Sequence, residues 1–184
     1  MEKKLLFGEI LNFAFKNGLK NFISLIAAFI LWILTIWIPY LNVGTTIALF
    51  TLPISMSRGK MISPTEIFKG KYRQYMGEFF MLQGLQSIVL FPAMLFGFFP
   101  AIVIGLGWSL STFLLIDKGM DPSKALAESN KLTFGHKWTI FFVYLVLFIP
   151  MFIPIFNIIY IFIYIPIIFS AQAFIYKTLT EIPE

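Results

Sequence analysis

The chain has 184 residues, of which 59% are hydrophobic, 18% aromatic and only 12% charged. Soluble domains carry about a quarter charged residues, so this composition excludes a water-soluble globule and predicts an integral membrane protein. The sequence contains no cysteine, which excludes disulfides and thiolate chemistry.

Three stretches without Asp, Glu, Lys or Arg predict the membrane-embedded part: 21–57, 79–116 and 138–176. One helical crossing needs roughly 20 residues, so each stretch is long enough for two crossings around a turn, marked by proline, glycine or asparagine. We therefore predict an all-α membrane protein with six transmembrane helices in three hairpins, near 22–39, 43–57, 79–97, 100–116, 138–154 and 158–176. Several of these are short, and re-entrant hairpins that stop near mid-bilayer are the alternative.

The fourteen basic residues all lie outside the three uncharged stretches. Because Lys and Arg accumulate in cytoplasmic loops, this pattern predicts a multi-pass protein of the cell (cytoplasmic) membrane with both termini in the cytoplasm. The tips of the three hairpins would then face the opposite side.

Each hairpin is preceded by an amphipathic segment, which we expect to lie in the membrane interface with its apolar face toward lipid. Ser63-Pro64-Thr65-Glu66 has the pattern of a capping box, and Asp121-Pro122 begins the next such segment. Gly77 and Gly135 are predicted to end these helices. Pro64, Gly77 and Pro92 recur at one constant offset as Pro122, Gly135 and Pro150. The sequence thus predicts one polytopic domain, 1–184, with a threefold internal repeat of units near 1–57, 62–116 and 120–176.

The segment from Gly119 to Trp138 resembles a motif, Pro-x-x-Ala-Leu-x-x-Ser-x-x-Leu-x-x-Gly, of a bacterial integral-membrane family called domain of unknown function 975. It is also similar to the membrane domain attached to glycerophosphoryl diester phosphodiesterases. The matching positions are Pro122, Ala125, Leu126, Ser129, Leu132 and Gly135. The resemblance implies a multispanning protein with no established catalytic role, in which these residues are structural.

Basic residues of the two later amphipathic segments are candidate contacts for lipid headgroups: Lys69, Lys71, Arg73, Lys124, Lys131 and Lys137. They predict anionic membrane lipids as partners and make a membrane surface a simpler partner than nucleic acid. Ala101, Gly105 and Ser109 form a small-residue stripe that favours close helix packing, within the chain or in a homo-oligomer.

Gln83, Gln86 and Thr112 are candidates for the lining of a polar cavity, together with other neutral polar residues such as Thr46, Ser109 and Gln172. Hydrogen bonding between helices is the commoner use of such side chains. We predict no charged residue inside the membrane, which disfavours proton-coupled pumps.

The lone histidine, His136, and the helix-end acids Glu78 and Asp117 do not make a catalytic set, and we expect no enzyme activity, cofactor or metal. The sequence therefore favours a non-enzymatic, structural, lipid-interacting or regulatory membrane protein. The alternative is a channel or transporter subunit with a small polar pathway.

Overall fold

The computed structural model of the protein describes residues 5–154 and 156–180, without the side chains of residues 156–159. All regular structure in these residues is helical, which confirms the all-α prediction. The α-helices are α1 (Phe7–Lys20), α2 (Phe22–Thr35), α3 (Pro39–Ser57), α4 (Met76–Leu95), α5 (Phe98–Gly107), α6 (Ser111–Lys118), α7 (Pro122–Thr133), α8 (Lys137–Phe148) and α9 (Phe156–Thr180). The 3₁₀ segments are η1 (Pro64–Phe68), η2 (Gly70–Tyr75) and η3 (Ile149–Phe152).

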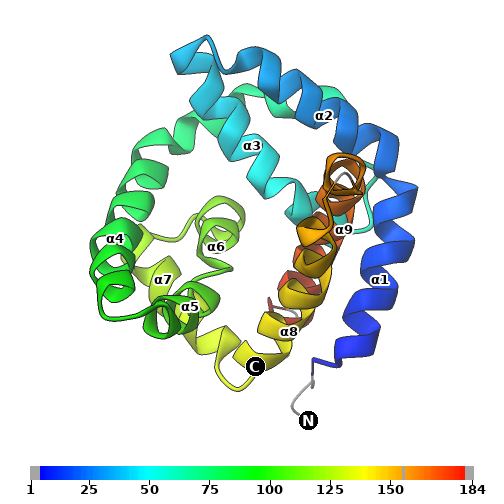
Figure 1. Cartoon of the computed structure of the whole chain (residues 1–184). Helices are drawn as coiled ribbons and strands as arrows, with labels where there is room; N and C mark the ends of the chain where they lie inside the picture. The colour runs from blue at the N-terminus through cyan, green and yellow to red at the C-terminus, as the bar shows by residue number, and fades with distance from the viewer. Residues whose placement is uncertain (1–4, 155, 181–184) are drawn as a thin grey trace.

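The helices are arranged in a ring, with α6 on its inner side (Figure 1). Each amphipathic segment packs against the helix that ends a hairpin: η1 and η2 against α3, α7 against α5 and α6, and α1 against α9. The contact of α1 with α9 joins the first and last helices of the chain and closes the ring.

Among the described residues, three helices are long and apolar enough to cross a membrane: Gly70–Leu95, Phe98–Lys118 and Tyr160–Thr180. Two bent pairs, α1 with α2 (73°) and α7 with α8 and η3 (90°), raise the number of candidate spans to five if each pair counts as one. These spans indicate a multi-pass membrane protein, with fewer candidate spans than the six that the sequence predicted.

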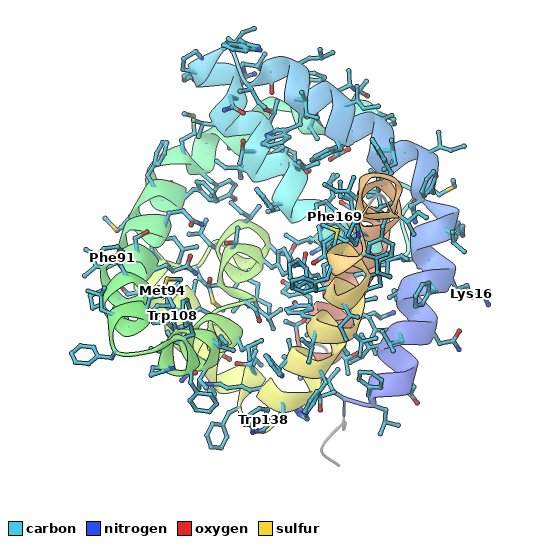
Figure 2. The ribbon with its side chains drawn as sticks, viewed as in Figure 1. Lys16, Phe91, Met94, Trp108, Trp138 and Phe169 are labelled. Atoms are coloured by element: carbon cyan, nitrogen blue, oxygen red, sulfur yellow. The ribbon has the colours of Figure 1, made fainter. Side chains whose placement is uncertain are left out.

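The outer surface of the ring is apolar, as a surface in contact with lipid must be. Leu82 is the only buried residue of α4, and Phe91 on this helix is 68% exposed. Phe91 and Trp138 project outward, whereas Phe169 lies among the inner side chains (Figure 2). An exposed helix of this composition needs lipid or protein around it.

Helices α2 and α3 of the first hairpin, like the 12-residue α8, are not candidate spans by themselves. Helix α2 has 14 residues, too few to cross roughly 30 Å of hydrocarbon, and α3 is not among the candidate spans. Buried polar contacts join the two helices: the Trp32 indole donates to Thr46 at 2.8 Å, and the hydroxyls of Thr35 and Thr45 are 2.8 Å apart. This geometry fits the alternative of a short hairpin better than two full crossings.

The apolar faces of the three amphipathic segments face protein, which corrects the prediction that they face lipid. Ile10, Ala14 and Gly18 of α1 are buried beside α9. Ile67 and Tyr72 are buried in η1 and η2, and α7 buries Ala125, Leu126, Ser129 and Thr133. An amphipathic pattern predicts only that one face of the segment is removed from water. A neighbouring helix can cover that face as well as lipid can.

The segment before α4 also differs from the predicted single helix. It forms two 3₁₀ pieces broken at Lys69, and Gly77 lies inside α4 instead of ending a helix. The Ser63 and Asp121 side chains make no capping hydrogen bond. By contrast, Gly135 follows α7 with a φ of 81°, as predicted, and Gly97, with a φ of 120°, forms the turn between α4 and α5.

The structure brings Arg73 to the tip of the first hairpin, whereas the sequence predicts basic residues and hairpin tips on opposite faces. The Arg73 side chain packs beside Gly44, where a Cβ would lie 2.6 Å from Arg73 Cγ, and its guanidinium lies 6.0 Å from the centre of the Tyr40 ring. Tyr40 stands at the start of α3, the hairpin tip that we expected on the opposite face. The segment 62–75 therefore runs back along α3 toward that tip.

The same reversal occurs in the second hairpin. Phe99, at its tip, has its ring 6.2 Å from that of Trp138, at the start of α8. Helix α7 thus returns along α5 and α6 toward the tip, as the segment 62–75 does along α3.

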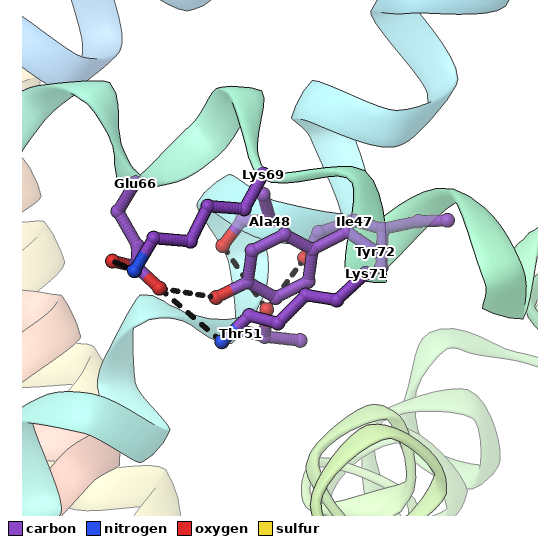
Figure 3. A network of polar contacts seen from close by, with 7 residues as sticks. All are labelled: Ile47, Ala48, Thr51, Glu66, Lys69, Lys71 and Tyr72. Carbon is purple, nitrogen blue, oxygen red and sulfur yellow. Dashed lines mark hydrogen bonds and ion pairs between the residues drawn. The ribbon is translucent and has the colours of Figure 1, made fainter.

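A polar network joins η1 to η2 where both pack beside α3 (Figure 3). The Glu66 carboxylate accepts hydrogen bonds from the Lys69 ammonium at 2.5 Å and from the Tyr72 hydroxyl at 3.2 Å, and lies 3.2 Å from Lys71 Nζ. Burial raises the pKa of Glu66, but the hydrogen bonds and charges of Lys69 and Lys71 outweigh it, so the pKa lies below its ordinary value of 4.5.

This network makes stability depend on pH. A depressed carboxyl pKa stabilises the fold above 4.5 and loses its effect as the pH falls through the lower folded value. We expect Glu66→Gln to cost about 1 kcal/mol at neutral pH and to match the wild type once the pH is well below 4.5, measured by unfolding in detergent. Glu128→Gln, which removes a pair 3.9 Å apart, is the control and should change little. A pH-independent cost of Glu66→Gln would contradict the assignment.

The contact of α1 with α9 gives a second prediction. A Cβ on Gly18 would lie 3.0 Å from the Pro166 carbonyl oxygen, whereas one on Gly8 would meet nothing within 4 Å. Gly18→Leu should therefore lower the free energy of unfolding by about 1–3 kcal/mol through overpacking, and Gly8→Leu should not. Equal midpoints for the two variants in thermal unfolding would show that α1 does not pack as described.

Candidate functional site

The centre of the candidate site is a break in the candidate span Phe98–Lys118. Helix α5 ends at Gly107 and α6 begins at Ser111. The Ser129 hydroxyl of α7 fills this break: it accepts from the Leu110 amide at 3.1 Å and donates to the Gly107 carbonyl at 2.7 Å. The Thr133 hydroxyl donates to the same carbonyl at 3.2 Å. In apolar surroundings, free backbone groups must find such partners.

Lys137 lies beside this break. Its ammonium donates to Asn130 Oδ1 at 2.8 Å, and a Cβ on Gly107 would lie 2.6 Å from that oxygen and 3.1 Å from Lys137 Nζ. A larger side chain at position 107 would have to displace the ends of the Asn130 and Lys137 side chains. The sequence predicts Lys137 at the cytoplasmic boundary and no charge within the membrane, whereas the structure brings its ammonium next to Gly107, in the middle of the candidate span Phe98–Lys118.

A central cavity of about 470 Å³ lies on the inner side of α6. Its polar lining comes from several helices, and its apolar lining consists of phenylalanines. The structure brings the predicted cavity residues Gln83 and Thr112 together here. The polar lining is Thr46 of α3, Gln83 of α4, Ser109 between α5 and α6, Thr112 of α6 and Gln172 of α9.

A second cavity, of about 480 Å³, adjoins the central one because both are lined by Ser109 and Gln172. Its lining is more apolar than that of the central cavity, with Tyr144, Tyr164 and Phe148 among its walls. Neither cavity has an ionisable Asp, Glu, Lys, Arg or His among its lining residues. Their chemistry is therefore hydrogen bonding and apolar contact.

Gln86, the third predicted cavity residue, is not in this lining. Its amide donates to the Ser111 hydroxyl at 2.9 Å and so ties α4 to the start of α6. This is the hydrogen-bonding use between helices that the sequence left as the commoner alternative.

Most of the predicted headgroup contacts have partners inside the chain. Besides Lys69 and Lys71 on Glu66, Lys124 lies 3.1 Å from Asp121 and Lys131 lies 3.9 Å from Glu128. Such exposed pairs are weak, so these lysines can still meet lipid. Lys137 and Arg73 are the candidates to which no carboxylate is paired in the described part of the chain.

The small-residue stripe is interrupted by the helix break. Ala101 is buried in α5, but Ser109 follows the end of that helix, and a Cβ on Gly105 would meet nothing within 4 Å. No helix of the described chain packs closely on Gly105. Contact there with another subunit stays a prediction.

The acids and the histidine do not form a catalytic cluster. Asp117 accepts hydrogen bonds from the Arg58 guanidinium and, at 2.7 Å, from the Tyr176 hydroxyl, and so joins the ends of α3, α6 and α9. Glu78 is exposed in the first turn of α4, and His136 directly precedes α8. Within the described residues no group of His, Asp or Glu could hold a metal ion.

No family model matches the sequence, and no curated protein or solved structure matches it either. The resemblance of the segment 119–138 to the family with domain of unknown function 975 therefore stays a prediction. The structure gives its motif serine, Ser129, the role of capping the broken span.

Removing that cap should destabilise the protein. Ser129→Ala leaves the buried Leu110 amide without a partner, which costs about 1–3 kcal/mol. Ser123→Ala, at an exposed position of the same helix, is the matched control and should be nearly neutral. Denaturant titration in detergent measures both changes, and equal effects of the two variants would argue against a buried cap.

Proposed function

We propose that this chain is a non-enzymatic, multi-pass membrane protein that binds a small, uncharged polar solute in its central cavity and lets it pass, as a channel or transporter subunit does. The observation that carries the proposal is the lining of this cavity. Thr46, Gln83, Thr112 and Gln172 from four helices, with Ser109, present neutral hydrogen-bonding groups to one space of about 470 Å³.

The chemistry of the lining supports a neutral solute. Hydroxyl and amide side chains donate and accept hydrogen bonds, whereas an ion would need charged groups or rings of carbonyls around it. The phenylalanines Phe50, Phe79 and Phe113 make up the rest of the wall, so the site combines apolar contact with a few directed polar groups.

The break between α5 and α6 supports the same proposal. Interrupted helices with satisfied backbone groups line the binding sites of many transporters, and here Ser109 in the break borders both cavities. The adjoining cavity opens toward the apolar outer surface, where Ile102, Leu145 and Phe148 of its wall are 42%, 39% and 44% exposed, so the polar solute itself would be held in the central cavity.

The finer topology belongs to the proposal as well. The order of an amphipathic segment followed by a hairpin recurs along the chain. The threefold repeat is supported by corresponding contacts in which each amphipathic segment packs on the end of a hairpin: η1 and η2 on α3, α7 on α5 and α6, and α1 on α9. A homo-oligomer joined through the open side of Gly105 fits the same ring.

A flux assay tests the function. Purified protein in liposomes should raise the permeability to glycerol or urea above that of protein-free liposomes, measured by stopped-flow light scattering. Thr112→Leu should lower this permeability at least to about half, since it adds bulk and removes a hydrogen-bonding group from the lining. Thr139→Leu is the matched control on α8, outside both cavities, and should leave it unchanged.

If no solute crosses, the result favours the lipid-interacting or regulatory function over a pathway. Wild-type permeability equal to that of empty liposomes for both solutes would reject the pathway. Equal effects of Thr112→Leu and Thr139→Leu would show that the central cavity is not the route.

A further inference from the structure

A separate groove between α5 and α8 has a composition unlike that of the central cavity. It has a volume of about 110 Å³, and its walls include Phe99, Ile102, Leu106, Trp138 and Phe141, with Lys137 at its edge. The ring of Trp138 lies 6.2 Å from that of Phe99 and 5.9 Å from that of Phe141. The groove is thus lined by three aromatic side chains and one cation.

The groove opens on the apolar outer surface. Phe99 is 62% exposed, Trp138 60% and Ile102 42%. The groove adjoins the cavity of about 480 Å³, since Ile102, Leu106 and Phe141 line both. A flexible apolar chain could therefore enter from the lipid side and continue inward.

In the described part of the chain, no carboxylate lies within ion-pair distance of the Lys137 ammonium. The Lys137 ammonium has the neutral Asn130 oxygen as its hydrogen-bond partner, whereas four other predicted headgroup lysines lie within ion-pair distance of a carboxylate. A charge beside the middle of a membrane span is costly, and such residues are found paired. The site is therefore complementary to an anion.

We propose that this groove binds a long-chain carboxylate, with its carboxylate on Lys137 and its chain along Phe99, Trp138 and Phe141. A carboxylate is small enough to sit beside the middle of a span, and it pairs directly with an ammonium. A phospholipid headgroup would carry several more polar groups to that depth. This inference does not depend on solute passage through the central cavity.

Quenching of Trp138 fluorescence tests the proposal on the full-length protein in detergent. Brominated stearic acid is titrated into the wild type and into Trp138→Phe, and the difference between the two curves reports the groove. We expect saturable quenching in the wild type. Lys137→Gln should weaken the apparent affinity about fivefold or more, the ratio given by one basic residue near an anionic group.

Two further variants keep the test independent of any folding defect. Asn130→Asp places a carboxylate beside Lys137 at an exposed position and should weaken the affinity in the same way. Lys124→Gln, at an exposed lysine that is paired with Asp121, should leave the affinity unchanged.

Three results would overturn the proposal. If the brominated methyl ester quenches Trp138 as strongly as the acid does, the negative charge of the carboxylate has no role in binding. A loss in Lys124→Gln equal to that in Lys137→Gln would indicate nonspecific surface attraction. Tighter quenching by brominated phosphatidylglycerol than by the acid would assign the groove to phospholipid.

Discussion

Backbone groups that leave a helix inside apolar surroundings must be given partners, and the arrangement around α5 and α6 depends on this constraint. The carbonyl of Gly107 and the amide of Leu110 are freed where the two helices part, and the Ser129 hydroxyl bonds to both. For this to happen, α7 must lie against the break. Glycine at position 107 leaves space for the ends of the Asn130 and Lys137 side chains, which lie where a Cβ would be.

The position of α7 in turn determines what surrounds the break. Because α7 returns along α5 and α6, α8 starts near α5, and the Trp138 ring reaches Phe99 at the tip of the second hairpin. The groove with Lys137 and the cavity walls contributed by α8 follow from that return. One capped break thus lies between a neutral, hydrogen-bonding cavity on its inner side and an aromatic groove with a cation on its outer side.

The other contacts of the ring also place apolar faces against protein and pair the nearby charges. The apolar faces of the amphipathic segments pack against neighbouring helices. The surface left to face lipid therefore belongs to the hairpins, and above all to α4. Charged groups near the packed segments are then paired: Glu66 with Lys69 and Lys71, and Asp117 with Arg58 and Tyr176. Membrane proteins commonly combine an apolar exterior with paired polar groups inside.

The sequence by itself determined that the protein is built for lipid, that it is helical and where several of its turns lie, because composition and helix-breaking residues act locally. It also identified the polar residues Gln83 and Thr112 as neighbours of a cavity. Only the tertiary structure decided which surface each amphipathic stripe meets, since lipid and a neighbouring helix satisfy an apolar face equally well. The break at 108–110, its cap by Ser129 and the place of Lys137 also needed the fold. They join residues far apart in the chain, and no local pattern records which backbone group a distant hydroxyl will reach.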